Sequence, residues 1–382
     1  MPTLLRCLRC GTAQPFDPAA YLCPACGTGD DGADPGILDV EYDYAAVDPA
    51  AFGSVPARGL SRWSGLLPTS VGSASLPVGE TPLVAAPRLA SSLGLRELWL
   101  KDDTRNPTRS LKDRATAVAL AMAQAGGRSE LYCASAGNAA VSLAGFCAHA
   151  GLRAHAFVPA SASPARVAWL RRFGAEVHSV DGNYDDAFAE AERQGAEHRW
   201  YSRNCAFNPF LVEGKKTVSF EIAEALGWQA PDLVVAPVGD GCTLGAIGKG
   251  FREMVEVGRT ERLPRLLGVQ SDAVQPLVRR LRGGTGYAPD GTTAAASIAV
   301  RRPRNALRLL AEVRRSDGTL LAVSDDEMRA AQRRLAREAG VVAELTSAAG
   351  LAGLEKLAEE ESLAGRSAVI VITGGRLDDD DS

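Results

Sequence analysis

The chain has 382 residues, of which 46% are hydrophobic and 23% are charged, and its formal net charge is -4. This length and hydrophobicity allow large cores, and we expect two globular lobes with an appendage. The slightly acidic balance lacks the basic surface that nucleic-acid binding requires. Residues 1–9 lack the apolar stretch of a secretory signal, and no apolar run reaches the length of about 20 residues that crosses a bilayer. We therefore expect a cytoplasmic protein without nucleic-acid or membrane partners.

Two C-x-x-C-G turns open the chain, and twelve residues separate Cys10 of the first from Cys23 of the second. Each turn can direct two thiolates at one tetrahedral ion, while glycine takes the tight bend. A pair of disulfides is the alternative, which a cytoplasmic chain does not favour. Four sulfur ligands leave no open coordination position, so such an ion has a structural role. The pattern predicts a zinc-ribbon-like segment over residues 1–34, with structural Zn²⁺ on Cys7, Cys10, Cys23 and Cys26.

After an arm rich in Gly, Pro and Ala at residues 36–77, short apolar runs alternate with helical patterns. The expected strands cover residues 97–101, 131–134, 153–158, 176–180, 233–238, 265–269 and 368–373. The expected helices cover residues 112–125, 139–150, 164–173, 185–194, 215–226, 244–255 and 325–339. This alternation predicts an α/β fold in which parallel sheets carry helices on both faces. Ligands of such sheets bind at the carboxyl ends of the strands.

Lys112 lies at the start of an expected helix, in the segment Asn-Pro-Thr-Arg-Ser-Leu-Lys-Asp at residues 106–113. A lysine amine becomes a nucleophile when it is partly desolvated or lies beside positive potential, and a helix N-terminus can provide both. Lys112 is therefore a candidate for a covalently bound cofactor. A solvated lysine at a helix start is the alternative that this segment alone leaves open.

Three loops at strand ends could contact a ligand. In residues 135–139, the Ser135 hydroxyl and the backbone amides could bind a carboxylate, and the Asn138 amide could donate to another oxygen. Residues 239–245 form a glycine-rich turn into a helix, which favours a phosphate, and Thr243 could add a hydroxyl. Thr373 leaves a buried strand beside two glycines and could face a ligand nitrogen. Taken singly, the first loop could be an ordinary N-cap turn and the third a plain C-terminal turn.

A lysine, a phosphate loop, a carboxylate loop and a strand-end hydroxyl together meet the needs of pyridoxal phosphate (PLP). From about residue 79 to residue 377 the chain resembles the fold-type II PLP-dependent enzymes, and within them the threonine synthases. The motifs are GETPL at 79–83, NPTRSLKDR at 106–114, ASAGN at 134–138, DGNYDDA at 181–187, EGKKT at 213–217, PVGDG at 237–241 and TG at 373–374. Some members of that family also carry a zinc-ribbon-like segment at the N-terminus.

The resemblance implies an α/β fold with two doubly wound parallel-sheet lobes besides the zinc ribbon. Residues 35–112 would form the arm and the start of the large PLP domain, residues 113–205 the small lobe, and residues 206–382 the remainder of the large domain. We also expect a homodimer.

The same resemblance implies a role for single residues. Lys112 would form the Schiff base with the cofactor and move protons, Asn138 would contact its phenolic oxygen, and Thr373 would meet its pyridine nitrogen. A hydroxyl does not enforce a protonated pyridinium, which suits elimination or replacement at the β or γ carbon and disfavours transamination. The residues that would hold the cofactor's phosphate are Gly239, Asp240, Gly241, Cys242, Thr243 and Leu244. Those that would contact the substrate are Ser135, Ala136, Gly137, Ala139, Arg109 and Arg114.

The chain departs from the threonine synthase pattern where substrate would bind. The arginine that the family places ahead of Glu213 is Leu211 here, and Arg109 or Arg114 could supply a cation from another direction. We expect a PLP-dependent lyase that converts O-phosphohomoserine to threonine or performs a related specialised reaction. A hydroxy-amino-acid dehydratase or ammonia-lyase, a β-replacement synthase, and an inactive binding paralogue are the alternatives.

Several further residues have a plainer expected role. The four histidines, at positions 149, 155, 178 and 198, have no partner in the sequence pattern and are expected to be structural. Of the cysteines beyond the zinc segment, Cys205 and Cys242 are expected near the ligand-binding pocket. Arg304 is a candidate for an anion site beside this pocket.

Overall fold

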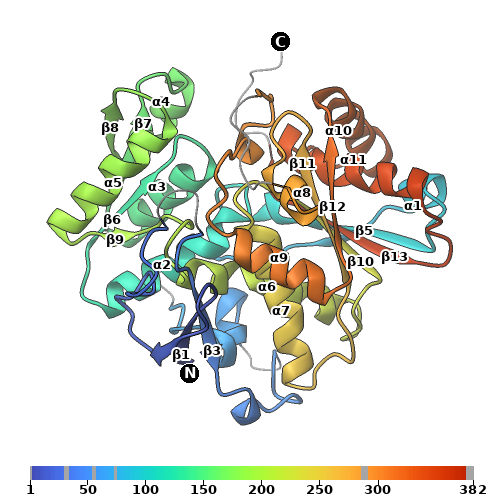
Figure 1. Ribbon diagram of the computed structural model, residues 1–382, viewed down its shortest axis with the longest axis horizontal. Helices are drawn as coiled ribbons and strands as arrows, with labels where there is room; N and C mark the ends of the chain where they lie inside the picture. Colours follow the sequence, from blue (N-terminus) through green and yellow to red (C-terminus); the bar gives the residue numbers. More distant parts are fainter. Residues whose placement is uncertain (1, 30–33, 54–56, 73–74, 285–290, 376–382) are drawn as a thin grey trace.

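The structure is a computed structural model, and it describes residues 2–29, 34–53, 57–72, 75–284 and 291–375. The described chain forms two α/β lobes and a small N-terminal sheet (Figure 1). The acidic run at residues 378–381 lies outside the described residues. Within the described ranges, no helix is both long and apolar enough to span a bilayer.

The large lobe contains a six-stranded sheet with the order β12-β11-β10-β13-β5-β4. All neighbouring pairs are parallel except β4 with β5. Every side chain of the central strand β13 is buried, because helices cover both faces of the sheet. In Figure 1, α10 and α11 lie on one side of this sheet and α6, α7 and α9 on the other. The strands are β4 (Leu83–Ala85), β5 (Glu97–Asp102), β10 (Leu233–Pro237), β11 (Arg265–Ser271), β12 (Thr319–Val323) and β13 (Ser367–Ile372).

The helices of the large lobe are α1 (Pro87–Ser92), α6 (Phe210–Ala225), α7 (Cys242–Glu256), α8 (Pro276–Leu281), α9 (Ala306–Arg315), α10 (Asp325–Ala339) and α11 (Leu345–Glu360). Helix α10 coincides with its expected range, since Ser324 and Glu327 form a capping box at its start and Gly340 ends it in the left-handed conformation. Helix α6 begins five residues earlier than expected, at Phe210. Short 3-10 helices cover Tyr44–Ala46, Gly59–Leu66, Asp103–Arg105 and Ala296–Ile298.

The small lobe contains a four-stranded parallel sheet with the order β8-β7-β6-β9. It spans residues 130–202 and therefore lies inside the expected range of 113–205. Helix α2 (Lys112–Ala125) packs against both α3 of this lobe and α6 of the large lobe, so its N-terminus lies where the lobes meet. The strands are β6 (Glu130–Ala134), β7 (Arg153–Pro159), β8 (Glu176–Val180) and β9 (Tyr201–Ser202), and the helices are α3 (Asn138–Ala150), α4 (Pro164–Arg172) and α5 (Tyr184–His198).

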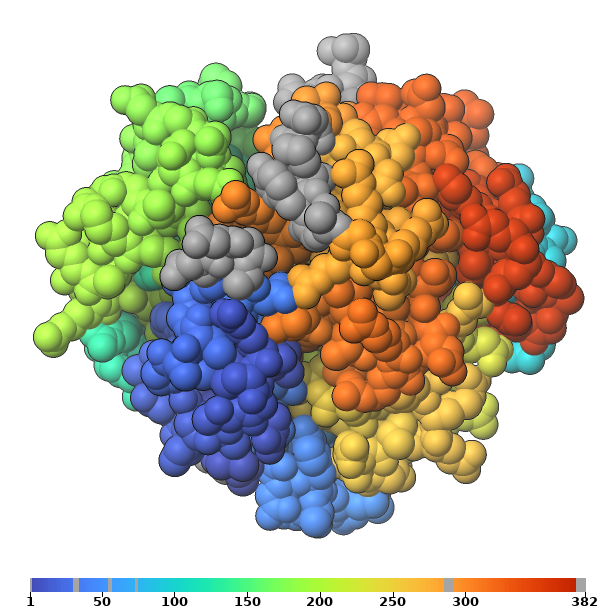
Figure 2. All heavy atoms as spheres, in the orientation of Figure 1, coloured from blue at the N-terminus to red at the C-terminus, as the bar shows by residue number. Residues whose placement is uncertain are grey.

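The N-terminal segment forms an antiparallel sheet of β1 (Pro2–Cys7), β2 (Ala13–Pro15) and β3 (Leu38–Tyr42). Figure 2 shows it, in blue, on the surface of the larger body. Asp39 of β3 is buried against that body, where it accepts a hydrogen bond from Lys249 at 2.9 Å and pairs with Arg252 at 3.3 Å and with Arg308. These cations lower the pKa of Asp39 against the opposing effect of burial, so the carboxylate stays charged and ties the segment to α7 and α9.

Candidate active site

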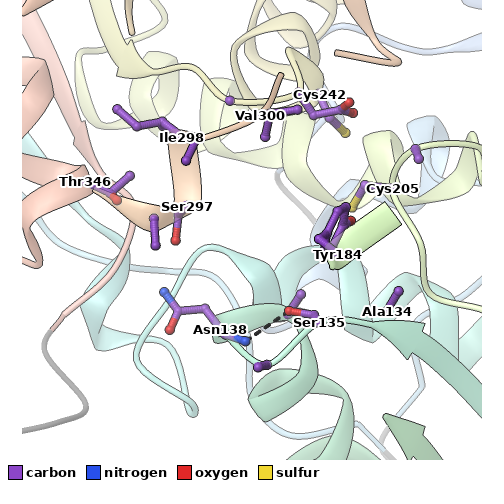
Figure 3. A pocket seen from close by; sticks show the side chains of 18 of the residues that line it. Ala134, Ser135, Asn138, Tyr184, Cys205, Cys242, Ser297, Ile298, Val300 and Thr346 are labelled. Atoms are coloured by element: carbon purple, nitrogen blue, oxygen red, sulfur yellow. Dashed lines mark hydrogen bonds between the residues drawn. The ribbon is translucent and has the colours of Figure 1, made fainter. Parts of the chain in front are cut away.

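A cavity of about 820 Å³ lies between the two lobes at the carboxyl ends of their strands. The loop after β6 contributes one wall, and the loop after β10 contributes the facing wall. In Figure 3, Ser135 and Asn138 of the small lobe face Cys242 and Val300 of the large lobe across the cavity. This volume is large enough for a cofactor with an attached amino acid.

Lys112 lines the cavity at the first position of α2. Burial lowers the pKa of its amine to about 8, and the nearby cations Lys215 and Arg203 act in the same direction. The carbonyl of Lys112 accepts a hydrogen bond from the Arg203 guanidinium at 3.1 Å, which fixes the start of the helix. A lysine with this pKa has an appreciable neutral fraction near pH 7, as a nucleophile requires.

The glycine-rich segment of residues 239–243 leads from β10 into the first turn of α7, which begins at Cys242. Gly241 has a φ of +91°, and a Cβ at Gly239 would approach the Ser297 carbonyl oxygen to 2.7 Å, so both positions require glycine. The buried Asp240 carboxylate accepts hydrogen bonds from the Arg304 backbone amide and the Asn305 side chain, both at 2.6 Å. Asp240 therefore fixes the loop to residues 304–305, while the helix start leaves backbone amides for an anion.

Asp240 also has an altered acidity. Burial raises the pKa of Asp240 to about 6, although the backbone amide of Arg304 opposes this effect. Its carboxylate would repel a phosphate, so its part in an anion site is limited to its backbone and to holding the loop.

The opposite wall is the loop of residues 135–139. The Ser135 hydroxyl accepts a hydrogen bond from the Gly137 amide at 3.1 Å, which closes the turn ahead of α3. The Asn138 side-chain amide donates to the Glu344 carboxylate at 3.0 Å. Burial raises the pKa of Glu344, which lines the cavity just ahead of α11. No sequence motif indicated Glu344, because only the fold brings residue 344 beside residue 138.

Thr373 follows β13 and lines the cavity. Its hydroxyl lies 3.0 Å from the Ser347 hydroxyl, and Ser347 also accepts a hydrogen bond from the Gly374 amide at 2.9 Å. Ser347 thus orients Thr373, although the sequence analysis did not single it out. A ligand nitrogen at this wall would meet a hydroxyl and not a carboxylate.

Two cysteines and a lysine form a cluster in the wall of the cavity, which we call the thiol–lysine cluster and which consists of Cys205, Lys215 and Cys242. The Lys215 ammonium donates to both sulfur atoms, each at 3.1 Å, and Arg203 donates to the Cys205 sulfur at 3.3 Å. The hydrogen bond from Cys242 and the charges of Lys215 and Arg203 lower the pKa of Cys205 despite its burial. The two cations therefore favour the thiolate form of Cys205, while the pKa of Cys242 is raised.

Two of the substrate residues expected from the sequence do not reach the cavity. Arg114 is fully buried and pairs with Asp103 and Glu221, each at 2.7 Å. Arg109 is exposed, with a φ of +64°, and is not part of the cavity lining. Leu211 lies in the hydrophobic core with 0% exposure.

The remaining expected residues line the cavity, namely Lys112, Ser135, Ala136, Gly137, Asn138, Ala139, Gly239, Asp240, Gly241, Cys242, Thr243, Leu244 and Thr373. Arg304 lines it as well, with its guanidinium over the Phe188 ring at 4.4 Å. The lining also includes five basic side chains that had been given no role in the site from the sequence, Arg166, Arg203, Lys215, Arg301 and Arg302.

Residues 74–374 match the family model of pyridoxal-phosphate dependent enzymes. The chain is 35% identical over 379 residues to the threonine synthase of Methanosarcina acetivorans, which covers 98% of this chain and 91% of the relative. It is 36% identical over 381 residues to the threonine synthase of Methanocaldococcus jannaschii, with 97% and 92% covered. Among solved structures, a processed threonine deaminase from Solanum lycopersicum superposes with a TM-score of 0.69 at 19% identity, over 81% of this chain and 87% of that one. An L-serine ammonia-lyase from Rhizomucor miehei superposes with a TM-score of 0.69 at 20% identity, over 78% and 94%.

The sequence comparisons and the shared architecture define the same class of protein, the fold-type II enzymes that use PLP. The chain belongs to the pyridoxal-phosphate dependent enzyme family. Within that family its similarity to threonine synthases extends over nearly its whole length, and it is a threonine synthase-like PLP-dependent lyase. The resemblance inferred from the sequence motifs is thereby confirmed.

Proposed function

We propose that this lyase removes phosphate from a phosphorylated amino acid, with O-phosphohomoserine as the substrate and threonine and phosphate as the products. Water supplies the new hydroxyl, so the atoms balance. The observation that carries the proposal is Lys215, a cation in the cavity wall that is 2% exposed. Among the residues that the structure describes, no carboxylate forms an ion pair with it, and its hydrogen-bond partners are the sulfur atoms of Cys205 and Cys242.

Lys215 also supplies a cation in place of the arginine of the family pattern, whose position is occupied by Leu211 in this chain. Both residues belong to α6, and Lys215 follows Leu211 by one helical turn. A buried ammonium ion is costly unless an anion compensates it. The Cys205 thiolate compensates part of this charge, while Arg203 adds a second buried cation beside it. Together the two cations suit a dianionic phosphate, so a basic residue at position 211 is not required.

The cavity fits PLP at each group of the cofactor. Lys112 supplies the amine, the loop of residues 239–244 supplies amides at a helix start, and Thr373 supplies a hydroxyl for the ring nitrogen. When bound, PLP stabilises the electron pair that remains when a proton leaves the carbon beside the amino group. We propose that the Lys112 amine takes and returns this proton, and that Ser135 with the amides of 136–139 holds the substrate carboxylate.

The reaction is tested by a product assay. We expect the purified enzyme with PLP to release threonine and phosphate in equal amounts from O-phosphohomoserine. Serine, threonine and O-phosphoserine serve as alternative substrates. A keto acid formed from serine or threonine, without phosphate release from O-phosphohomoserine, would establish a dehydratase and contradict the proposal.

The part played by Lys215 is tested with Lys215→Gln. Loss of one charge-assisted contact predicts a decrease in kcat/KM for O-phosphohomoserine of about 10- to 100-fold. Lys356→Gln is the control, because the Lys356 ammonium donates to the Ala322 carbonyl and is not part of the cavity lining. If the dissociation constant of PLP rises instead and KM stays constant, then Lys215 serves the cofactor's phosphate and not the substrate's.

We further propose that the N-terminal segment binds structural Zn²⁺ through four cysteines. The sulfur atoms of Cys7 and Cys26 are 3.9 Å apart and those of Cys10 and Cys23 are 3.8 Å apart, and all four lie within 4.8 Å of one another. Four ligands at the usual Zn–S distance of about 2.3 Å are separated by about 3.8 Å in a tetrahedron. Metal analysis of the purified protein tests this, and we expect Cys10→Ser to hold one zinc ion fewer than the wild type.

We also propose that the protein is a homodimer and that it is cytoplasmic. Light scattering on the purified chain measures the first, and we expect twice the mass of one chain. Cell fractionation measures the second.

A further inference from the structure

We propose that the small lobe carries a second metal site, in which His155, Glu176 and His178 bind one divalent transition-metal ion. The three residues lie on β7 and β8, and β8 is the edge strand of the four-stranded sheet. His155 is directly opposite Glu176 in the strand pairing, and His178 is two residues further along β8. The two histidines were expected to lack partners, and the fold brings them together.

The distances between the donor atoms suit a single ion. His155 Nδ1 lies 3.2 Å from His178 Nε2 and 3.4 Å from Glu176 Oε2, and the three atoms lie within 4.8 Å of one another. Nitrogen and oxygen ligands at about 2.0–2.1 Å from a tetrahedral ion are separated by about 3.3 Å. The Glu176 side chain is 55% exposed, so solvent can reach the site and supply a fourth ligand.

Residues around the cluster fix the tautomer and the orientation of His155. Its Nε2 lies 2.9 Å from the Glu130 carboxylate, which can only accept a hydrogen bond when ionised. Nε2 therefore carries a proton, and in the neutral imidazole the Nδ1 lone pair points toward His178 and Glu176. Carboxylates hold metal-binding histidines in this way in known sites.

Aromatic rings hold both imidazoles in place. Trp200 stacks on His155 with centroids 3.6 Å apart and planes 8° from parallel. Phe157 stacks on His178 at 4.4 Å and 13°. The two ligands therefore lose little conformational freedom on binding an ion, which favours affinity.

A simple hydrogen bond from His178 to His155 explains only part of this arrangement. With His155 neutral, Nδ1 also lies 3.4 Å from the Glu176 carboxylate with no proton between them, and two acceptors repel each other; a second proton on His155 would remove this repulsion and is separated from a metal ion by the zinc titration below. A metal ion satisfies all three atoms at once. Two imidazoles and one carboxylate suit Zn²⁺ and its neighbours Co²⁺, Ni²⁺ and Cu²⁺, and not Mg²⁺ or Ca²⁺. The bound ion would fasten the edge strand β8 to β7.

Zinc titration of the dialysed enzyme with PLP bound tests the site by calorimetry, with total zinc measured in parallel. We expect the wild type to bind one equivalent of Zn²⁺ beyond any zinc held by the four cysteines. Co²⁺ distinguishes the two sites, since thiolate ligands give near-ultraviolet charge-transfer bands and the histidine site does not. His178→Ala should lose the additional equivalent, and Glu130→Gln should weaken it by about tenfold or more.

Glu176→Gln is the second ligand variant. The residue is largely exposed, so this variant keeps its fold even where His178→Ala does not, and we expect its zinc affinity to fall at least about tenfold. His198→Ala is the matched control: His198 stacks on the same Trp200 at 4.8 Å but is outside the cluster, and its titration should equal that of the wild type. The proposal is overturned if the wild type binds no additional equivalent, as it would if a proton bridged the cluster. It is also overturned if Glu176→Gln binds zinc as the wild type does.

Discussion

Lys112 combines two effects that a lysine on the protein surface lacks. Burial removes water from its amine, and Lys215 and Arg203 add positive potential, so the pKa of Lys112 falls to about 8. The thiolate of Cys205 acts in the opposite direction, because its negative charge favours the protonated amine. The reactivity of this single amine is therefore set by the charges around it.

The pKa of Lys112 predicts how cofactor capture depends on pH. Only the neutral amine attacks an aldehyde, and its fraction rises with pH through about 8 and then levels off. Between pH 7 and pH 9 we expect the rate of PLP binding to the cofactor-free enzyme to rise about tenfold, where a lysine of ordinary pKa would give about 100-fold. Absorbance of the bound cofactor measures this rate, and Lys112→Ala should show no borohydride-stable adduct. A rise that continues undiminished to pH 10 would contradict the lowered pKa.

Two substitutions in the thiol–lysine cluster should move this pH profile in opposite directions. Cys205→Ser removes a negative charge that raises the pKa of Lys112, so the midpoint should shift to lower pH. Lys215→Gln removes a positive charge that lowers the pKa of Lys112, so the midpoint should shift to higher pH. Shifts of equal sign in the two variants would show that the cluster does not act on Lys112 through its charge.

At the scale of helices, a buried ion cluster joins α2 to α6. Arg114 of α2 pairs with Asp103 and with Glu221 of α6, and Lys101 of β5 reaches the same Glu221 at 2.7 Å. Burial opposes ionisation of Glu221, but Arg114 and Lys101 lower its pKa below the ordinary value. The cluster therefore holds the helix that carries Lys112 against the large lobe.

Arg114→Met should destabilise the fold strongly, because it leaves two buried carboxylates without their main partner. We expect a loss of about 3–5 kcal/mol in the free energy of unfolding at pH 7, measured by urea denaturation. The pKa of Glu221 is lowered in the folded enzyme, so this carboxylate stabilises the wild type above its unfolded pKa and progressively less as the pH falls. The difference in the free energy of unfolding between the variant and the wild type should consequently become smaller from pH 7 to pH 4. A difference of under about 1 kcal/mol at pH 7 would show that the cluster contributes little.

The assignment of Arg114 from the sequence was wrong for a geometric reason. Positions two apart on a helix point to nearly opposite faces, so when Lys112 faces the cavity Arg114 faces the core. Helix α10 was predicted because its polar and apolar residues alternate with a clear helical period. Helix α11 was not predicted, since small buried residues such as Ala348, Gly350 and Ala352 give no amphipathic pattern.

Contacts between distant segments explain the site residues that the sequence did not indicate. Lys215 meets Cys205 and Cys242, and Glu344 meets Asn138, only after both lobes have folded. Local motifs located the glycine loop and Lys112, because backbone geometry and helix starts leave a signal in adjacent residues.

At the scale of the whole molecule, the N-terminal segment is held in two independent ways. The four cysteines gather the turns at residues 7–11 and 23–27, while Asp39 of β3 is fixed to the large lobe by three cations. Strand β1 pairs with β3 along its length, so the cysteine cluster and the buried carboxylate act on the same sheet. Loss of metal should therefore loosen the turns first and leave β3 in place.

Limited trypsin digestion measures this difference. In Cys10→Ser or in chelator-treated protein, we expect rapid cleavage after Arg6 and Arg9, while the region from β3 onward stays intact because Asp39 remains bound. Cys10 is exposed, so its substitution removes a proposed zinc ligand without creating a cavity in the core, and the buried Cys147→Ala is the control that keeps zinc. The double variant Cys10→Ser with Asp39→Asn should release the whole segment and extend the cleavage beyond residue 42. Identical digestion of the zinc-loaded and zinc-free proteins would mean that Asp39 and strand pairing alone hold the segment.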